Sequence, residues 1–174
     1  YSGRRYSSLN KINRSTVMHL SLAWVSRLRE GAYGKIGREG TIEFPSFGNP
    51  TVKASALMVD HTIYITTPDN AWALDARDGR ELWHYFWKTR GGTHIANRGV
   101  GIWNDYVYME TPDNYLVSLE AKTGKERWHK VIADFNLQYS SPPAPVIVDN
   151  HVIVGTGNDI DAPGFLQSFD PVTG

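Results

Sequence analysis

A repeat with a period of 45 residues is the feature that most constrains how this chain folds. The segment 73–83 (ALDARDGRELW) recurs at 118–128 (SLEAKTGKERW), and a third copy begins at 168–174 (SFDPVTG). Each full copy places a glycine shortly before a tryptophan, which is Trp83 in the first copy and Trp128 in the second. A period of ~45 residues is typical of one four-stranded blade of a β-propeller.

The residues upstream of each copy repeat as well. The segments 59–67, 103–111 and 148–156 match one another, and the first two run into Pro-Asp-Asn. They are rich in β-branched and aromatic residues and end at turn-forming residues, which is typical of strands. In the first unit we expect strands at about 55–59, 62–67, 71–76 and 80–85. No stretch has a sustained helical period. The fold class predicted is all-β, a partial β-propeller of about two to three four-stranded blades.

The repeated tryptophans are expected to be structural. A large apolar ring with one polar N–H group suits an interface that recurs once per repeat. Trp83 and Trp128 are therefore predicted to pack between neighbouring blades and to lie outside any active site.

Composition excludes several classes of function. The chain has 18 Lys and Arg against 18 Asp and Glu, so charge gives no support for a nucleic-acid partner. Without cysteine, the chain has no disulfide, thiolate metal site or cysteine nucleophile. Its apolar runs are too short for a transmembrane helix. The glycine-rich segment 31–40 does not have the spacing of a nucleotide-binding loop.

Taken together, three features resemble the pyrroloquinoline quinone (PQQ) dehydrogenases of the alcohol and glucose dehydrogenase type. They are the tryptophan repeat, the opening segment 1–14, and Leu22-Ala23-Trp24. The resemblance implies an eight-bladed propeller, of which this chain is interpreted as an N-terminal fragment, since it ends within a repeat. It divides the chain into a leader with a ring-closing outer strand (1–50), a first blade (51–90), a second blade (91–135) and a truncated third blade (136–174).

The resemblance also implies a chemistry. Such enzymes oxidise an alcohol or an aldose sugar hydroxyl by hydride transfer to PQQ, which is bound to a calcium or lanthanide ion. They are usually periplasmic and pass electrons to ubiquinone or cytochrome c. The catalytic base in the family is an Asp of a later blade, so none is expected before Gly174 and the fragment alone is expected to be inactive. Membrane association is not predicted either way.

The segment 93–100 (THIANRGV) carries the first candidate site. Alcohol-oxidising members have adjacent cysteines and then Asn-Arg-Gly, and Gly91-Gly92 stand at the cysteine positions here. Glucose dehydrogenases instead have a His four residues before the Arg, the spacing of His94 and Arg98. By resemblance, His94 would stack on PQQ and Arg98 would bind a carboxylate or quinone oxygen. The alternative is a solvated His and a surface Arg. The spacing and the absent disulfide favour a sugar substrate slightly.

The loop 157–165 (GNDIDAPGF) carries the second candidate site. By resemblance, Gly157 and Asn158 would contact the cofactor, and Asp159 would occupy the position of a metal-binding Glu. A carboxylate oxygen is a suitable calcium ligand. Asp161 is the weaker candidate, and an ordinary Asn-Asp turn explains the same residues equally well.

Lys53 is the third candidate, because a Lys at this position could pair with a PQQ carboxylate. A solvated surface Lys is the favoured alternative. For the whole chain, the alternative function is a propeller with the same repeat that binds no quinone and acts as an assembly scaffold, similar to an outer-membrane assembly lipoprotein. Such a scaffold needs the structural tryptophans but not His94, Arg98 or Asp159.

Overall fold

The computed structural model describes residues 9–28, 52–90, 97–157 and 163–174. The described residues form three antiparallel sheets in which each strand pairs with the next one along the chain. Short 3-10 turns lie at Val17–His19 (η1) and Phe135–Leu137 (η4). No helix among these residues is long and apolar enough to cross a membrane.

The three sheets correspond to the three copies of the repeat. The first contains β1 (Leu57–Val59), β2 (Thr62–Thr67), β3 (Asn70–Asp75) and β4 (Glu81–Phe86). The second contains β5 (Gly101–Trp103), β6 (Tyr106–Glu110), β7 (Tyr115–Glu120) and β8 (Glu126–Val131). The third contains β9 (Val146–Val148), β10 (His151–Thr156) and β11 (Phe165–Phe169). The strand prediction for the first unit is confirmed to within two residues at each boundary.

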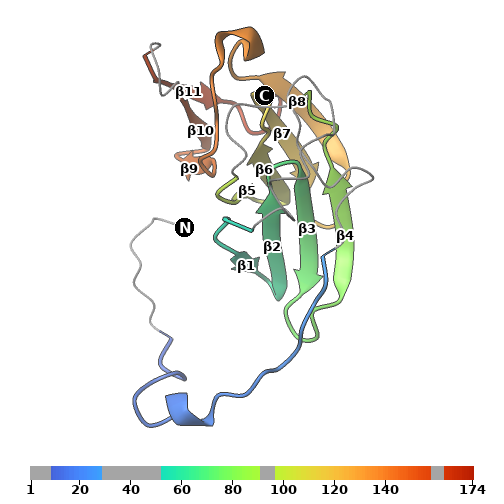
Figure 1. Cartoon of the computed structure of the whole chain (residues 1–174), viewed down its shortest axis with the longest axis vertical. Coiled ribbons are helices and arrows are strands. Elements are labelled where there is room, and N and C mark those ends of the chain that lie inside the picture. Colours follow the sequence, from blue (N-terminus) through green and yellow to red (C-terminus); the bar gives the residue numbers. More distant parts are fainter. Residues whose placement is uncertain (1–8, 29–51, 91–96, 158–162) are drawn as a thin grey trace, which may run out of the picture.

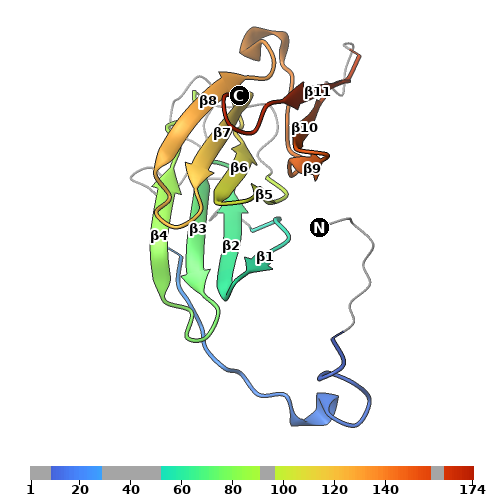
Figure 2. The same ribbon diagram turned by 180° about the vertical axis from the view of Figure 1, so that it is seen from behind.

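The sheets lie face to face like successive blades, with β1, β5 and β9 on one side and β4 and β8 on the other (Figures 1 and 2). The apolar core therefore lies between the sheets. One buried cluster, which includes Tyr64, Trp83 and Met109, joins the first sheet to the second. Another, which includes Tyr108, Val152 and Val154, joins the second to the third. The predicted partial β-propeller is confirmed.

Tight turns set the register of the first two strands in the first and third sheets. Asp60 and His61 both have positive φ (46° and 62°), as do Asp149 and Asn150 (44° and 62°). Two consecutive positive φ angles match the right-handed twist of a hairpin, and Asp and Asn tolerate this conformation better than most residues.

Each repeated tryptophan docks on the next repeat, as predicted. The Trp83 Nε1–H donates to Ala121 O (2.8 Å), and the Trp128 Nε1–H donates to Val172 O (2.9 Å). Trp24 makes the same kind of contact with the first sheet, since its Nε1–H donates to Ala76 O (3.1 Å).

The N-terminal strap, residues 9–28, otherwise reaches away from the sheets (Figure 1). The described residues 20–28 form no strand in this chain. That residues 22–24 belong to an outer strand that closes a ring, and the domain boundaries as a whole, stay predictions.

Candidate functional site

The segments that precede β1, β5 and β9 are joined to one another by backbone hydrogen bonds. The Arg98 N–H donates to Pro142 O (3.0 Å), and the Ser55 N–H donates to Arg98 O (3.2 Å). Arg98 is thus held on both sides of its backbone while its side chain stays exposed. These backbone bonds fix the position of the Arg98 main chain, and no described residue accepts a hydrogen bond from its guanidinium.

Gly99 explains why a glycine follows this arginine. Its φ is +127°, which L side chains rarely adopt, and an added Cβ would lie 3.0 Å from Ser55 O. The close approach of the two segments therefore depends on the missing side chain.

Asn97 is the residue that ties this segment to two strands. It is 1% exposed. Its Oδ1 accepts hydrogen bonds from Thr66 Oγ1 (2.6 Å) and from the Gly99 N–H (2.8 Å), and its Nδ2 donates to Glu110 O (2.8 Å). No pattern in the sequence pointed to Asn97 beyond its place beside Arg98 in Asn-Arg-Gly. Its hydrogen bonds hold the segment that precedes that arginine against two strands.

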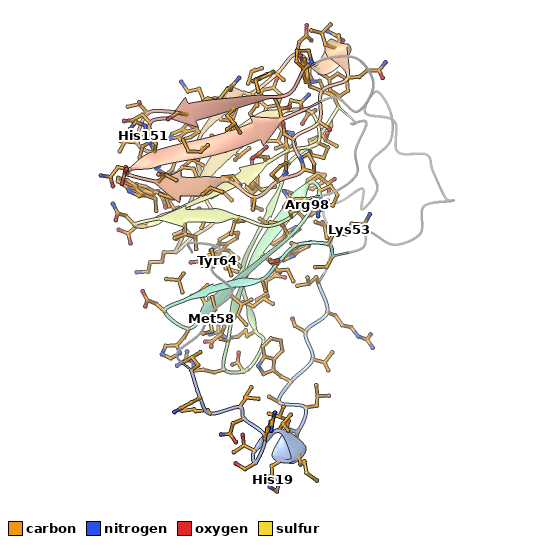
Figure 3. The ribbon with its side chains drawn as sticks, turned by 90° about the vertical axis from the view of Figure 1, so that its left-hand side faces the viewer. His19, Lys53, Met58, Tyr64, Arg98 and His151 are labelled. Atoms are coloured by element: carbon orange, nitrogen blue, oxygen red, sulfur yellow. The ribbon has the colours of Figure 1, made fainter. Side chains whose placement is uncertain are left out.

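Lys53 lies at the same end of the sheets as Arg98, and His151 lies at the opposite end (Figure 3). The backbone bond between Ser55 and Arg98 keeps the two segments together. Both cationic side chains are exposed, and neither has an ion-pair or hydrogen-bond partner within the part of the chain that the structure describes. Two cations at one rim, neither with a described anionic partner, suit an anionic ligand.

Gly157 lies beside the same rim, at the end of β10. Its N–H donates to Ser140 O (3.1 Å) and its carbonyl accepts from the Ser140 N–H (2.8 Å). A cavity of about 510 Å³ opens here, and its lining includes Ser140, Pro142, Pro143 and Gly157. A Cβ at Gly157 would meet no atom within 4 Å, so this glycine borders open space. Pro142 links the cavity to Arg98, whose N–H it binds.

The remaining predicted site residues, His94, Asn158 and Asp159, lie outside the described residues, as does Asp161. Within the described ranges, no group of three or more His, Cys, Asp or Glu side chains is placed to hold a metal ion. The structure thus brings together Arg98, Lys53 and Gly157 from the predicted set, and their roles as ligands stay predictions.

Glu110 is a further feature that the sequence analysis did not nominate. It is 1% exposed, and neither of its carboxyl oxygens has a hydrogen-bond partner among the described residues. Burial raises the pKa of Glu110 to about 9, and the nearby Ser141 hydroxyl lowers it only in part. A comparison of the repeats could have singled out Glu110, because the first and third repeats have the neutral residues Thr66 and Gly155 at the same position.

Comparison with protein families assigns this architecture. The profile of the PQQ family, described as glucose/ethanol/alcohol dehydrogenase, beta-propeller domain, matches residues 1–174. The chain belongs to this family.

Individual relatives agree with the family assignment. The chain is 35% identical to the dehydrogenase subunit of the alcohol dehydrogenase (quinone) of Gluconacetobacter polyoxogenes, over 100% of this chain and 23% of that protein. The structure of the quinohemoprotein alcohol dehydrogenase ADHIIG of Pseudomonas putida HK5 superposes with a TM-score of 0.78, at 31% identity, and the match covers 98% of this chain and 24% of that one. The chain spans about a quarter of the length of the relatives it matches.

Two other solved structures bear on the interpretation. A europium-containing methanol dehydrogenase superposes with a TM-score of 0.73 at 28% identity, over 98% of this chain and 28% of that one. BamB from Moraxella catarrhalis superposes with a TM-score of 0.56 at 17% identity, over 72% of this chain and 39% of that one. The likeness to BamB shows a shared fold alone.

The residues of this PQQ-family chain suit the cofactor of the family. PQQ is a tricarboxylate quinone, and the rim formed by the segments of Lys53 and Arg98 offers two cations without a described anionic partner. The planar guanidinium of Arg98 matches a carboxylate or a pair of adjacent oxygens, whereas the Lys53 ammonium acts as a point charge.

Proposed function

We propose that this chain forms part of the cofactor-binding wall of a PQQ-dependent dehydrogenase that oxidises an alcohol. Support comes from the family assignment over the whole chain and from relatives named alcohol dehydrogenases. The sequence spacing of His94 and Arg98 pointed slightly toward a sugar, and no relative described above is named for a sugar substrate. We therefore choose an alcohol.

One observation carries the proposal. Arg98 is held on both sides of its backbone at the rim of the inner segments, and its exposed guanidinium has no described partner. In the proposed function the guanidinium binds a carboxylate or quinone oxygen of PQQ, and Lys53 adds a second positive charge. Gly157 lets the cofactor approach the backbone at the end of β10. When bound, PQQ supplies the two-electron acceptor for the hydride of the alcohol.

The metal and the electron acceptor complete the proposal. Asp159 is the proposed ligand of a calcium or lanthanide ion, and His94 and Asn158 are proposed to contact the cofactor. A carboxylate suits either ion because both prefer oxygen ligands. Further proposals, which follow the family resemblance, are a periplasmic location and electron transfer to ubiquinone or cytochrome c. No residue of this chain is proposed as the catalytic base.

The test is a titration of the full-length protein with PQQ, first with calcium and then with a lanthanide, followed by tryptophan fluorescence. Loss of a charge-assisted hydrogen bond predicts that Arg98→Ala weakens binding roughly ten- to a hundredfold. Arg98→Lys restores the charge without the planar fork, so it should recover only part of the affinity. Arg14→Ala is the matched control, because Arg14 is exposed and belongs to the strap, whose His19 lies far from Lys53 and Arg98 (Figure 3).

Three further outcomes decide the proposal. His94→Ala should also weaken binding, and Lys53→Ala should weaken it less than Arg98→Ala does. A folded protein that shows no saturable binding with either metal would contradict the dehydrogenase proposal. The scaffold alternative would then be the one to pursue through its protein partners.

A further inference from the structure

Glu110 is an unusual residue for its place in the fold. It ends β6, where the first repeat has Thr66 and the third has Gly155. The side chain is completely buried, yet no described donor reaches either carboxyl oxygen. A buried carboxylate without donors is destabilising, so such a group takes up a proton or binds a cation.

The polar group that influences Glu110 is the hydroxyl of Ser141. This hydroxyl already donates to Asn114 Oδ1 (3.2 Å), and Asn114 Nδ2 donates in turn to Tyr139 O (2.8 Å). A hydroxyl oxygen that donates its proton elsewhere still has lone pairs to accept one. A protonated Glu110 can therefore donate to Ser141 Oγ and complete a chain of donors and acceptors. An ionised Glu110 can receive the Ser141 proton, which lowers its pKa in part, only if that hydroxyl turns away from Asn114.

Glu110 also lies between the two supports of Arg98. Its own carbonyl accepts the hydrogen bond from Asn97 Nδ2 (2.8 Å), and Asn97 precedes Arg98. Ser141 precedes Pro142, whose carbonyl accepts the Arg98 N–H. A change in the charge of Glu110 therefore acts on both segments that hold Arg98 in place.

We propose that Glu110 is a positioning residue in its neutral form, with its carboxyl O–H donating to Ser141 Oγ and so fixing the two segments that support Arg98. The proposal rests on the proposed function, since it assigns to Glu110 a role in holding the cofactor-binding arginine. Ionisation removes the donor and places an uncompensated charge between the second and third sheets.

The surroundings explain why the neutral form persists at neutral pH. Burial raises the pKa of Glu110 to about 9, and no charged side chain contributes to that shift. The titratable side chains on the elements packed nearby are Tyr106 and Tyr108 of β6, Asp113 of the following turn, Tyr115 and Glu120 of β7, Tyr139, Arg98, and His151 of β10. Glu120 pairs with Tyr106 at the far end of β7, and His151 lies at the opposite end of the sheets from Arg98 (Figure 3).

The first test measures the affinity of the full-length protein for PQQ from about pH 7 to about pH 10. Above pH 9, the dissociation constant of the wild type should rise toward tenfold per pH unit, because binding then requires uptake of one proton. Glu110→Gln keeps a neutral donor of the same shape, so its affinity at pH 7 should match the wild type and the rise should disappear. Glu120→Gln is the matched control and should keep the wild-type profile. If the dissociation constant of Glu110→Gln for PQQ rises above pH 9 as steeply as that of the wild type, the proposal is overturned.

The second test does not use PQQ. Infrared difference spectra between the wild type and Glu110→Gln should show a protonated carboxyl band at neutral pH, and this band should vanish from the wild type above pH 9. Absence of the band at neutral pH would overturn the proposal even where PQQ binds. If the band is present but no form of the protein binds PQQ, the role of Glu110 in positioning Arg98 falls with the proposed function, and its protonation stands.

Discussion

The indole ring of Trp83 lies directly on the turn glycine Gly124 of the next repeat. A Cβ at Gly124 would lie 2.6 Å from the ring, and the φ of Gly124 is +70°. Trp24 covers Gly79 in the same way, so the contact between a tryptophan and a glycine recurs from one repeat to the next. The two residue types are needed together, because the ring occupies the space that any side chain would need.

Gly124→Ala should therefore destabilise the protein. The positive φ and the clash with the ring together predict a loss of about 2–5 kcal/mol in the free energy of unfolding. Chemical denaturation of the full-length protein measures it. Gly157→Ala is the control, because a Cβ there meets nothing within 4 Å, and it should change stability by less than about 1 kcal/mol. Equal losses in both variants would contradict the docking role of Gly124.

Asp113 should be sensitive to loss of one carboxylate oxygen. Its Oδ1 accepts from Trp87 Nε1 (2.7 Å) and from Thr111 Oγ1 (2.8 Å), and its Oδ2 accepts from the Arg90 N–H (3.1 Å). In Asp113→Asn an amide NH₂ replaces one of these acceptors and faces a donor. The expected loss of stability at neutral pH is about 1–3 kcal/mol. Denaturation at pH 7 measures it, and an unchanged stability would contradict it.

Asp69 occupies in the first repeat the position that Asp113 occupies in the second. There we expect the substitution by Asn to increase stability at neutral pH. Burial raises the pKa of Asp69 to about 6, with a smaller contribution from Asp113. A folded-state pKa above the unfolded value means that stability falls as pH rises from about 4 to about 6, by ~1.4 kcal/mol per pH unit. Asp69→Asn removes this loss and keeps an oxygen that can accept the bond from Asn70 Nδ2.

The measurement for Asp69 is the free energy of unfolding at several pH values. Asp69→Asn should be more stable than the wild type at pH 7, by up to ~3 kcal/mol, and the difference should vanish near pH 4. Glu110 is unchanged in this variant, so its own contribution cancels in the comparison. A variant less stable than the wild type at pH 7 would show that burial is not what governs Asp69.

The elements that the sequence predicted well are those that depend on local chemistry. The strands of the first unit and the docking of Trp83 follow from alternating β-prone residues, turn residues and one repeated aromatic position. Each of these signals lies within a single repeat, so the period reveals them without knowledge of the partners.

The parts that the sequence did not predict depend on partners far along the chain. Asn97 binds Thr66, which lies 31 residues away, and Glu110 is buried against the segment around Ser141. The two aspartates of Pro-Asp-Asn share a motif, yet among the described residues an indole N–H and a hydroxyl donate to Asp113 and not to Asp69. Identical local sequence therefore leaves the sign of their contribution to stability undetermined until the packing is known.

Asn97 offers a way to separate the position of Arg98 from its charge. Asn97→Ala leaves three polar groups without their partner: the Thr66 hydroxyl, the Gly99 N–H and the Glu110 carbonyl. Each buried group left unpaired costs roughly 1–3 kcal/mol, so a clear loss of stability is expected. The affinity for PQQ should fall as well, although Arg98 is unchanged, because the segment before it is no longer fixed.

Asn97→Asp distinguishes positioning from simple destabilisation. An Asp keeps the acceptor for Thr66 and Gly99 but sets an oxygen, in place of the amide donor, against Glu110 O, so the link to β6 is lost. If that link positions Arg98, Asn97→Asp weakens PQQ binding under conditions where circular dichroism shows it fully folded. Asn136→Ala, at an exposed position in η4, should alter neither property. Wild-type affinity in both Asn97 variants would show that the backbone bonds from Ser55 and to Pro142 are sufficient to place Arg98.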